Sequence, residues 1–508
     1  MKGRLAFKLY LFLFLTTVSF RSYSQAGLFV LNEEIRVTRL AGTHKLNETS
    51  YVVCFSSDSY TSKEGIVLVN IDEQGKILWG KKYTGISRAI PYDFVITKDQ
   101  EIIVTGEARG YPYGDFARAF ILKTNKDGDI LWSYVYGDSY ISTSWGNAIS
   151  LSSTDGYLLS GMSEASSFTT LLDSKGDVAW TKSHAMKQAT ASLPLSDNGL
   201  VTSGSDFNKI FLSKLSMTGD TLVNKQIFSS ALFLDVPAVK RIRELKNGNL
   251  ALLVNANYSV HVVLVCDSKL NVLHAKVIDN PDVEDMKVDA EERLNLFIES
   301  GSEIRLMRLT KELELISETL SYRSPYSLLT VNYYQTSKAF EITDSNKLVY
   351  AIGSYNELDF VQTDIGGVAC NARNLGSITP TRVMDVPLEA SQYKVFSSLD
   401  FLKKEVSWEV TTLILSGKVL CQKDETLSVP LFKDRNINVY PNPTKDYLFF
   451  EVTKPVSAVF IYNMSGQQVY YTDKLHQQSI DIRKFPAGLY YVKAVEENGA
   501  YISKIIKK

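Results

Sequence analysis

The chain has 508 residues, of which 45% are hydrophobic and 22% are charged. A folded globular protein has such a composition, whereas a disordered chain has fewer apolar residues and more net charge. Lysine and arginine number 55 against 56 acidic residues, which leaves no surplus of positive charge for holding nucleic acid. The length exceeds one ordinary core, so we expect several domains or a repeat array with an appendage.

The N-terminus has the parts of a signal peptide. A basic start is followed by an apolar run over residues 9–15 and by the small-x-small pattern Ser22-Tyr23-Ser24. This run is shorter than the roughly 20 apolar residues that a membrane helix needs, and no later segment reaches that length. We therefore expect residues 1–24 to be removed before Gln25 and the remaining chain to be exported without a transmembrane segment.

The four cysteines predict two different states. Cys54 and Cys266 lie in the apolar stretches "YVVCF" and "VVLVC", where buried free thiols are expected. Cys370 and Cys421 flank one segment of an exported chain, so we predict that they form a disulfide.

A hairpin that recurs along the chain is the main organising feature. It is an alternating apolar strand, a polar turn with glycine, and a second strand with tryptophan, as in a β-hairpin whose glycine supplies the positive φ of the turn. The glycine precedes the tryptophan by four residues in each copy: Gly75 and Trp79, Gly128 and Trp132, Gly176 and Trp180. This offset differs from the sialidase Asp box, in which the tryptophan follows the glycine by three residues.

The same frame continues without tryptophan as far as "DFVQTDIGGVAC" (359–370), and a further hairpin precedes each copy. The result is seven units of four strands with a period of about 42 to 54 residues, which is typical of β-propeller blades. We predict an all-β protein with a seven-bladed β-propeller over residues 27–371, with tryptophans packed between blades. A pair of β-sandwiches with similar turns is the alternative.

Residues 372–436 have no repeat hallmark. They predict either extra strands against the last blade or a connecting segment with local structure.

The C-terminal region, residues 437–508, contains short alternating strands separated by the turns "MSG", "PAG" and "ENG". This pattern predicts a small antiparallel β-sandwich. It opens with "NVYPNP", whose two prolines have no N–H for a sheet and therefore belong at an edge or a strand start.

This region resembles the type A C-terminal sorting domain of the type IX secretion system of the Bacteroidota. The resemblance rests on the opening "YPNP", on "IYNMSGQQV", on "PAGLY" and on the basic end, and it assigns sorting-signal roles to Pro441, Asn442, Pro443, Gly466, Gly488, Leu489, Tyr490 and Lys504. It implies the secretion machinery as a partner, and a secreted or outer-membrane surface protein that passes through the periplasm. An ordinary adhesive sandwich is the alternative.

No pattern of catalytic or metal-binding residues is evident. The five histidines are scattered without metal-ligand spacing, and the chain has neither a G-x-S-x-G elbow nor a Walker A loop. We therefore predict no catalytic residue, no metal and no cofactor.

Aromatic residues in two connections of the second and third units are the candidate ligand-binding residues: Tyr111, Tyr113, Tyr140 and Trp145. Exposed rings with polar neighbours suit a glycan or a protein ligand, whereas the alternative role for these rings is packing at blade edges. The sequence predicts an extracellular or cell-surface binding protein. A propeller enzyme that acts on polysaccharide is the alternative, since propellers host both functions.

Overall fold

The computed structural model describes residues 25–30, 36–59, 62–84, 87–110, 116–137, 143–153, 155–163, 166–184, 188–206, 209–228, 237–257, 260–279, 283–300, 303–323, 340–343, 347–354, 357–364, 381–391, 397–398, 402–413, 415, 418–422, 438–451, 458–463, 468–472, 479–496 and 499–508. The chain forms two compact units, residues 1–423 and residues 424–508. All regular secondary structure in these described ranges is β-strand.

Within the described part of the first unit, six groups are antiparallel meanders of four consecutive strands. Groups 1 to 3 are β2 (Arg36–Asn47), β3 (Ser50–Ser59), β4 (Ser62–Asp72) and β5 (Ile77–Thr84); β6 (Arg88–Ile96), β7 (Ile102–Arg109), β8 (Arg118–Thr124) and β9 (Ile130–Gly137); and β10 (Ser144–Leu151), β11 (Tyr157–Ser163), β12 (Ser167–Leu172) and β13 (Val178–His184). Groups 4 to 6 are β14 (Gln188–Pro194), β15 (Gly199–Asp206), β16 (Lys209–Ser216) and β17 (Thr221–Phe228); β18 (Ala238–Glu244), β19 (Leu250–Asn257), β20 (Val260–Cys266) and β21 (Val272–Asp279); and β22 (Val283–Val288), β23 (Leu294–Ser300), β24 (Glu303–Leu309) and β25 (Leu315–Arg323).

Group 7 joins the two ends of the first unit. It consists of β26 (Phe340–Ile342), β27 (Lys347–Ser354), β28 (Glu357–Asp364) and the N-terminal strand β1 (Gln25–Val30). The sequence pattern predicts instead that the last unit is completed by a hairpin over residues 359–370. That prediction is wrong, because Gln362 of β28 faces Val349 of β27 on one side and Gln25 of β1 on the other, so both edges of the strand are taken.

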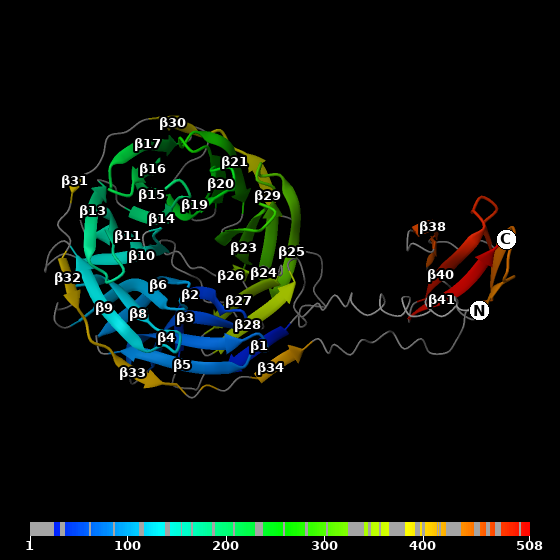
Figure 1. Ribbon diagram of the computed structural model, residues 1–508, viewed down its shortest axis with the longest axis horizontal. Helices are drawn as coiled ribbons and strands as arrows, with labels where there is room; N and C mark the ends of the chain where they lie inside the picture. The colour runs from blue at the N-terminus through cyan, green and yellow to red at the C-terminus, as the bar shows by residue number, and fades with distance from the viewer. Residues whose placement is uncertain are drawn as a thin grey trace, which may run out of the picture. The chain divides into compact units, whose positions relative to one another are not determined.

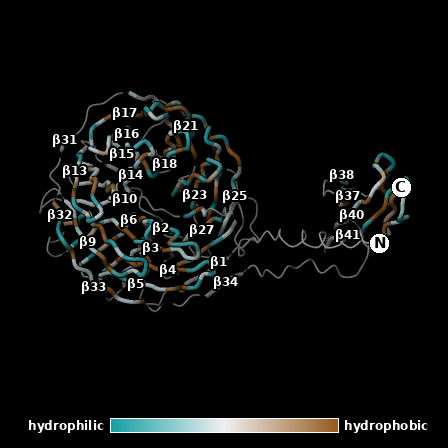
Figure 2. Tube along the Cα trace, viewed as in Figure 1, coloured by the Kyte–Doolittle hydropathy of each residue, from teal (hydrophilic) through white to brown (hydrophobic). Residues whose placement is uncertain are grey.

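The groups are arranged around a ring (Figure 1). The first strand of each group contacts the first strand of the next, from β2 through β6, β10, β14, β18, β22 and β26 back to β2. Each pair of neighbouring groups also shares its own cluster of buried apolar side chains. Apolar residues are accordingly spread around the ring (Figure 2), which is the propeller-like arrangement of sheets that bury both faces against neighbours.

The turn between the third and fourth strands explains the glycine and tryptophan offset. Gly128 and Gly176 have φ values of +77°, which side chains other than glycine adopt at a cost. A Cβ added to Gly128 would lie 3.1 Å from Trp79 of the preceding group, and one added to Gly176 would lie 3.1 Å from Trp132. The prediction that the tryptophans pack between groups is therefore confirmed, and each ring lies on the turn of the group that follows.

Where the tryptophan is replaced, the turn residue changes as well. Val223 occupies the tryptophan position of group 4, and the turn of group 5 has Leu270 at φ 63° with no exposed surface. Val223 packs against the same apolar cluster as Leu270. At the junction of groups 4 and 5, the Leu270 side chain therefore occupies the space that a tryptophan ring occupies at other junctions. Its positive φ is unfavourable for a leucine.

A belt of short strands follows the ring. It comprises β29 (Arg382–Asp385), β30 (Glu389–Ser391), β31 (Ser397–Ser398), β32 (Leu402–Glu405), β33 (Glu409–Thr412) and β34 (Lys418–Gln422). In that order these strands add antiparallel to β21, β17, β13, β9, β5 and β1, so the belt runs around the outside against the chain order of the groups (Figure 1). Residues 372–436, for which the sequence predicts either extra strands or a connecting segment, therefore contain extra strands, and these lie on six groups rather than on the last one alone.

Side chains fasten the belt to the ring. The Trp408 indole donates a hydrogen bond to the Ser133 hydroxyl at 2.7 Å, and its ring packs edge-on against Phe120. The Lys403 ammonium lies 3.7 Å from the centre of the Tyr134 ring and pairs with Asp177. The belt covers strand edges that would otherwise offer unpaired backbone groups.

The structure describes the side chains of two of the four cysteines. Cys54 and Cys266 are free and fully buried, as predicted, and burial raises the pKa of both thiols. Cys370 lies outside the described residues, as does the side chain of Cys421, so their disulfide stays a prediction.

The second unit contains two antiparallel sheets. Its strands are β35 (Asn438–Tyr440), β36 (Tyr447–Glu451), β37 (Ala458–Asn463), β38 (Gln468–Thr472), β39 (Ser479–Asp481), β40 (Gly488–Glu496) and β41 (Gly499–Lys507). One sheet has the order β35-β36-β39 and the other β38-β37-β40-β41. Leu448 and Phe450 of the first sheet share a buried cluster with Val459, Ile461 and Val492 of the second.

Candidate functional site

The first strands of the groups are bulged, and the bulges concentrate polar side chains at the inner side of the ring. The pairing register shifts at the same place in β6, β10, β14, β18 and β22. The extra residue of a β-bulge is left unpaired in its sheet, and the strand bends locally. In groups 5 and 6 this position holds Lys240 and Glu284, each followed by a second charged residue.

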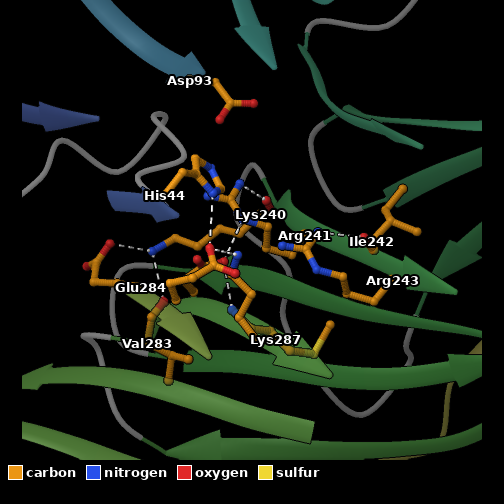
Figure 3. A network of polar contacts seen from close by, with 12 residues as sticks. His44, Asp93, Lys240, Arg241, Ile242, Arg243, Val283, Glu284 and Lys287 are labelled. Atoms are coloured by element: carbon orange, nitrogen blue, oxygen red, sulfur yellow. Dashed lines mark hydrogen bonds and ion pairs between the residues drawn. The ribbon is translucent and has the colours of Figure 1, made fainter. Parts of the chain in front are cut away.

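These two charged pairs join group 5 to group 6 (Figure 3). The Lys240 ammonium donates to the Val283 carbonyl at 2.9 Å and lies 3.3 Å from the Glu284 carboxylate. The Arg241 Nε donates to Asp285 at 2.5 Å, and both side chains are almost completely buried. Paired burial of this kind offsets the large cost of removing a charge from water.

Glu341 of group 7 extends the network. Its carboxylate lies 3.1 Å from Lys287 of group 6 and 3.0 Å from Nδ1 of His44 in group 1. Burial alone would raise the pKa of Glu341, but Lys287 and His44 outweigh it and hold the pKa at about 2. His44 and Lys287 both contact this carboxylate, so groups 6, 7 and 1 meet at one ionised group.

An aspartate ties groups 2 and 3 together. Asp93 of β6 accepts hydrogen bonds from its own neighbour Phe94 N–H at 3.0 Å and from Ile149 N–H of β10 at 2.9 Å. Asp285 of β22 accepts from Met286 N–H in the equivalent way. Both aspartates thus accept a hydrogen bond from the N–H of the next residue. Asp93 also bonds to the backbone of the neighbouring group, whereas Asp285 forms an ion pair with Arg241 of the neighbouring group.

A second charged cluster lies between groups 1 and 2. Arg88 pairs with Glu64 at 2.5 Å, and Arg109 lies 3.3 Å from Glu107. The Arg39 guanidinium lies 4.2 Å from the centre of the Tyr92 ring. Burial lowers the pKa of Arg39 to about 10, with Tyr92 and Glu107 opposing the shift, so the group stays protonated at neutral pH.

The aromatic residues predicted to bind ligand are only partly placed. Tyr111, Tyr113 and Tyr140 lie outside the described residues. Trp145 is the second residue of strand β10 rather than a loop residue, it is partly buried, and it pairs with Met162 of β11. Its role in binding stays a prediction.

Sequence reasoning missed the charged residues at the ring centre, although a signal exists. "KR" at 240–241 and "ED" at 284–285 are consecutive charges inside otherwise apolar strands, and they lie one repeat period apart with opposite signs. Complementary charges at equivalent repeat positions indicate contact between neighbouring units.

In the second unit, the opening motif lies beside the last strand. The side chain of Asn442 donates to the Lys504 carbonyl at 2.8 Å and accepts from Ile506 N–H at 2.9 Å. Thr444 N–H donates to the Ile506 carbonyl, and Lys508 N–H donates to the Thr444 carbonyl. The asparagine side chain therefore makes the bonds with β41 that the flanking Pro441 and Pro443 cannot make, since proline has no N–H.

The other residues of the predicted sorting signal lie on the same pair of strands. Gly488 and Leu489 pair with Lys507 and Ile506, and Lys504 pairs with Tyr491. The Tyr490 hydroxyl donates to the Pro486 carbonyl at 2.8 Å. Gly466 lies outside the described residues.

Comparison with known families identifies this unit. Residues 438–508 match the family described as "Secretion system C-terminal sorting domain". The C-terminal unit is a sorting domain. The resemblance drawn from its motifs is thus confirmed, and the sorting domain indicates export and a surface or secreted location.

Solved structures similar to the chain are distant. The structure of the Dos1 propeller has 11% identity and a TM-score of 0.39, with 62% of this chain and 75% of that chain covered. A protein from Lactobacillus plantarum has 13% identity and a TM-score of 0.39, with coverage of 58% and 96%. The extracellular domain of a protein described as a hybrid two-component system from B. thetaiotaomicron has 11% identity and a TM-score of 0.30, with coverage of 92% and 77%. A search of curated protein sequences found no match.

Two further observations apply to the described part of the chain alone. It contains no helix long and apolar enough to cross a membrane. It also contains no group of three or more histidine, cysteine, aspartate or glutamate side chains arranged to hold a metal ion.

Proposed function

We propose that this chain is an exported binding protein in which a seven-bladed β-propeller holds the ligand and the sorting domain directs secretion. The ring of sheets supports seven blades, with β1 as the outer strand of the last one. The shared core of the two C-terminal sheets supports a β-sandwich for the sorting domain. The secretion machinery is then the partner of the sorting domain, and residues 1–24 are the signal peptide that brings the chain to the periplasm.

The observation that carries the binding function is the convergence of charged side chains from separate groups at the ring centre. His44, Lys240, Glu284 and Lys287 come from three groups (Figure 3), and Glu341, which contacts His44 and Lys287, comes from a fourth. Propeller ligands are commonly held by residues of several blades, because the inner strands bring them to one place. A glycan or a protein segment with both hydrogen-bonding and charged groups fits such a surface.

The state of the central acid supports binding rather than polysaccharide hydrolysis. A glycosidase needs one carboxyl group with a raised pKa to protonate the leaving group. Glu341 is instead held ionised by two bases, with a pKa of about 2. Such a group anchors neighbouring side chains or a cationic part of a ligand.

Binding is tested on residues 25–508 with a glycan array, followed by titration with each glycan that binds. The Trp145→Ala variant should lose about 1 to 3 kcal/mol of affinity, as aromatic stacking platforms do, with an unchanged melting temperature. A large fall in the melting temperature would assign Trp145 to packing between groups. Turnover of a polysaccharide by the purified protein, lost on changing a central acid, would replace the binding function with an enzyme.

A further inference from the structure

Arg39 differs from the other charged residues of its cluster in having no acid of its own. Arg88 is bonded to Glu64, and Arg109 pairs with Glu107. Across the ring, Glu284 is engaged by Lys240. Among the residues that the structure describes, the Nε and Nη2 atoms of Arg39 are buried and make no hydrogen bond.

These two atoms form one edge of the guanidinium. The N–H bonds of Nε and Nη2 are parallel, and this fork matches the two oxygens of a carboxylate or the oxygens of a phosphate. The flat face of the guanidinium packs on the Tyr92 ring, whose centre lies 4.2 Å from the Arg39 Cζ. Burial and the neighbouring Glu107 raise the pKa of the Tyr92 hydroxyl, so the ring under the guanidinium is neutral.

Energetics argue against a purely structural role for this fork. A buried donor without an acceptor destabilises the folded protein, and more so when it carries charge. The nearby acids Glu107, Glu284 and Glu64 act on Arg39 through space, but each is bonded to another base or hydroxyl. Within the described part of the chain, the arrangement therefore leaves the Arg39 fork without an acid that pairs with it.

We propose that Arg39, stacked on Tyr92, is the anchor for an anionic ligand that carries a carboxylate or a phosphate group. This inference rests on the proposed binding function and names the ligand class: acidic sugars such as uronic acids, or phosphorylated compounds. Because Nε and Nη2 are buried, the anion reaches them only as neighbouring side chains move, so the site takes its final shape on binding.

The test measures the thermal stability of residues 25–508 with added anions. Sodium phosphate is compared with sodium chloride at equal ionic strength, and sodium glucuronate is compared with glucose in the same salt. A ligand that binds only the folded protein raises the melting temperature as its concentration passes its Kd. We expect a rise with glucuronate or with phosphate, and the one that acts identifies the source of the anionic group.

Variants separate binding from structure. R39Q should abolish the rise, and R39K should weaken binding at least tenfold because lysine keeps the charge without the fork. K45Q removes one charge from the same strand and should leave the rise intact. Without anion, R39Q should melt at the same temperature as the native chain or higher, since it removes a buried donor that has no acceptor.

The proposal is overturned if neither anion raises the melting temperature, or if R39Q responds as the native chain does. It is also overturned if R39Q melts several degrees lower without anion, which would make Arg39 structural. Neutral glycans that bind on the array without any anion response would overturn the anionic ligand and leave the proposed binding function in place.

Discussion

Glu341 lies between two bases, and its carboxylate is the point at which groups 6, 7 and 1 meet at the ring centre. Its pKa of about 2 lies below the ordinary glutamate value of 4.5, because Lys287 and His44 outweigh the effect of burial. A group whose pKa is depressed in the folded state stabilises the fold above its unfolded pKa. That stabilisation disappears as the pH falls through the folded pKa.

We predict that Glu341→Gln lowers the free energy of unfolding by about 1 to 3 kcal/mol at pH 7, since it leaves two bases without their acid. The difference between variant and native chain should shrink from about pH 4.5 down to about pH 2. Urea unfolding at pH 7, 4 and 3 measures it. Glu48→Gln, at an exposed pair with Lys45, is the control and should change little. A difference that is constant with pH would contradict the ion-pair explanation.

Asn442 replaces backbone pairing with side-chain pairing at the opening of the sorting domain. We predict that Asn442→Ala destabilises this domain by about 1 to 2 kcal/mol, for two lost hydrogen bonds at an exposed edge, and that less protein reaches the medium. Thermal unfolding and the secreted fraction are the measurements. Lys445→Ala, at a nearby exposed residue, should export normally. Normal export of the asparagine variant would mean that the pairing with β41 is dispensable for sorting.

Between elements, the packing of tryptophan on the next turn is the recurring contact. The sequence predicts the hairpins, the turns and the constant offset, because glycine and turn acids have local conformational reasons to be where they are. It does not show that Trp132 lies on Gly176 of the following group, since the offset within one hairpin says nothing of the neighbour. The sequence also does not predict that Val223 and Leu270 replace the tryptophan and the glycine at the junction of groups 4 and 5.

Trp132→Ala should therefore lower the free energy of unfolding by about 2 to 4 kcal/mol, because it removes a large, partly buried ring from the junction of groups 2 and 3. The adjacent Leu131 is 49% exposed, and Leu131→Ala should change stability by less than about 0.5 kcal/mol. Urea unfolding of both variants gives the comparison. Equal effects of the two substitutions would show that the tryptophan does not hold the junction.

The belt shows why part of the fold escapes prediction from sequence. Its strands have two to five residues, and the side chains of β33 are exposed throughout. A strand laid on the outer edge of a sheet has no buried face, so no alternation of apolar and polar residues marks it. The ring centre escapes for another reason: Arg39 comes from group 1 whereas Lys240, Glu284 and Glu341 come from groups 5, 6 and 7, and ring closure is needed to bring group 1 beside group 7.

At the scale of the whole molecule, the two units have separate cores and separate tasks. Their division at residue 423 implies that the ring folds without the sorting domain. We predict that deleting residues 437–508 leaves a folded ring in the periplasm, because the signal peptide provides passage across the inner membrane alone. Fractionation, with protease resistance as the test of folding, measures this outcome. Truncated protein in the medium at normal levels would contradict the role of the sorting domain, and the intact chain is the control.

Strand β1 lies between β28 and β34, so that Gln25 is paired with Gln362 on one side and Gln422 on the other. Strand β1 precedes both of its partners in the chain, so it stays without them until they have been synthesised. Until then group 7 lacks its fourth strand, and the ring is open between groups 7 and 1. Closure of the ring therefore depends on segments from both ends of the first unit, whereas each of the other six groups is built from four consecutive strands.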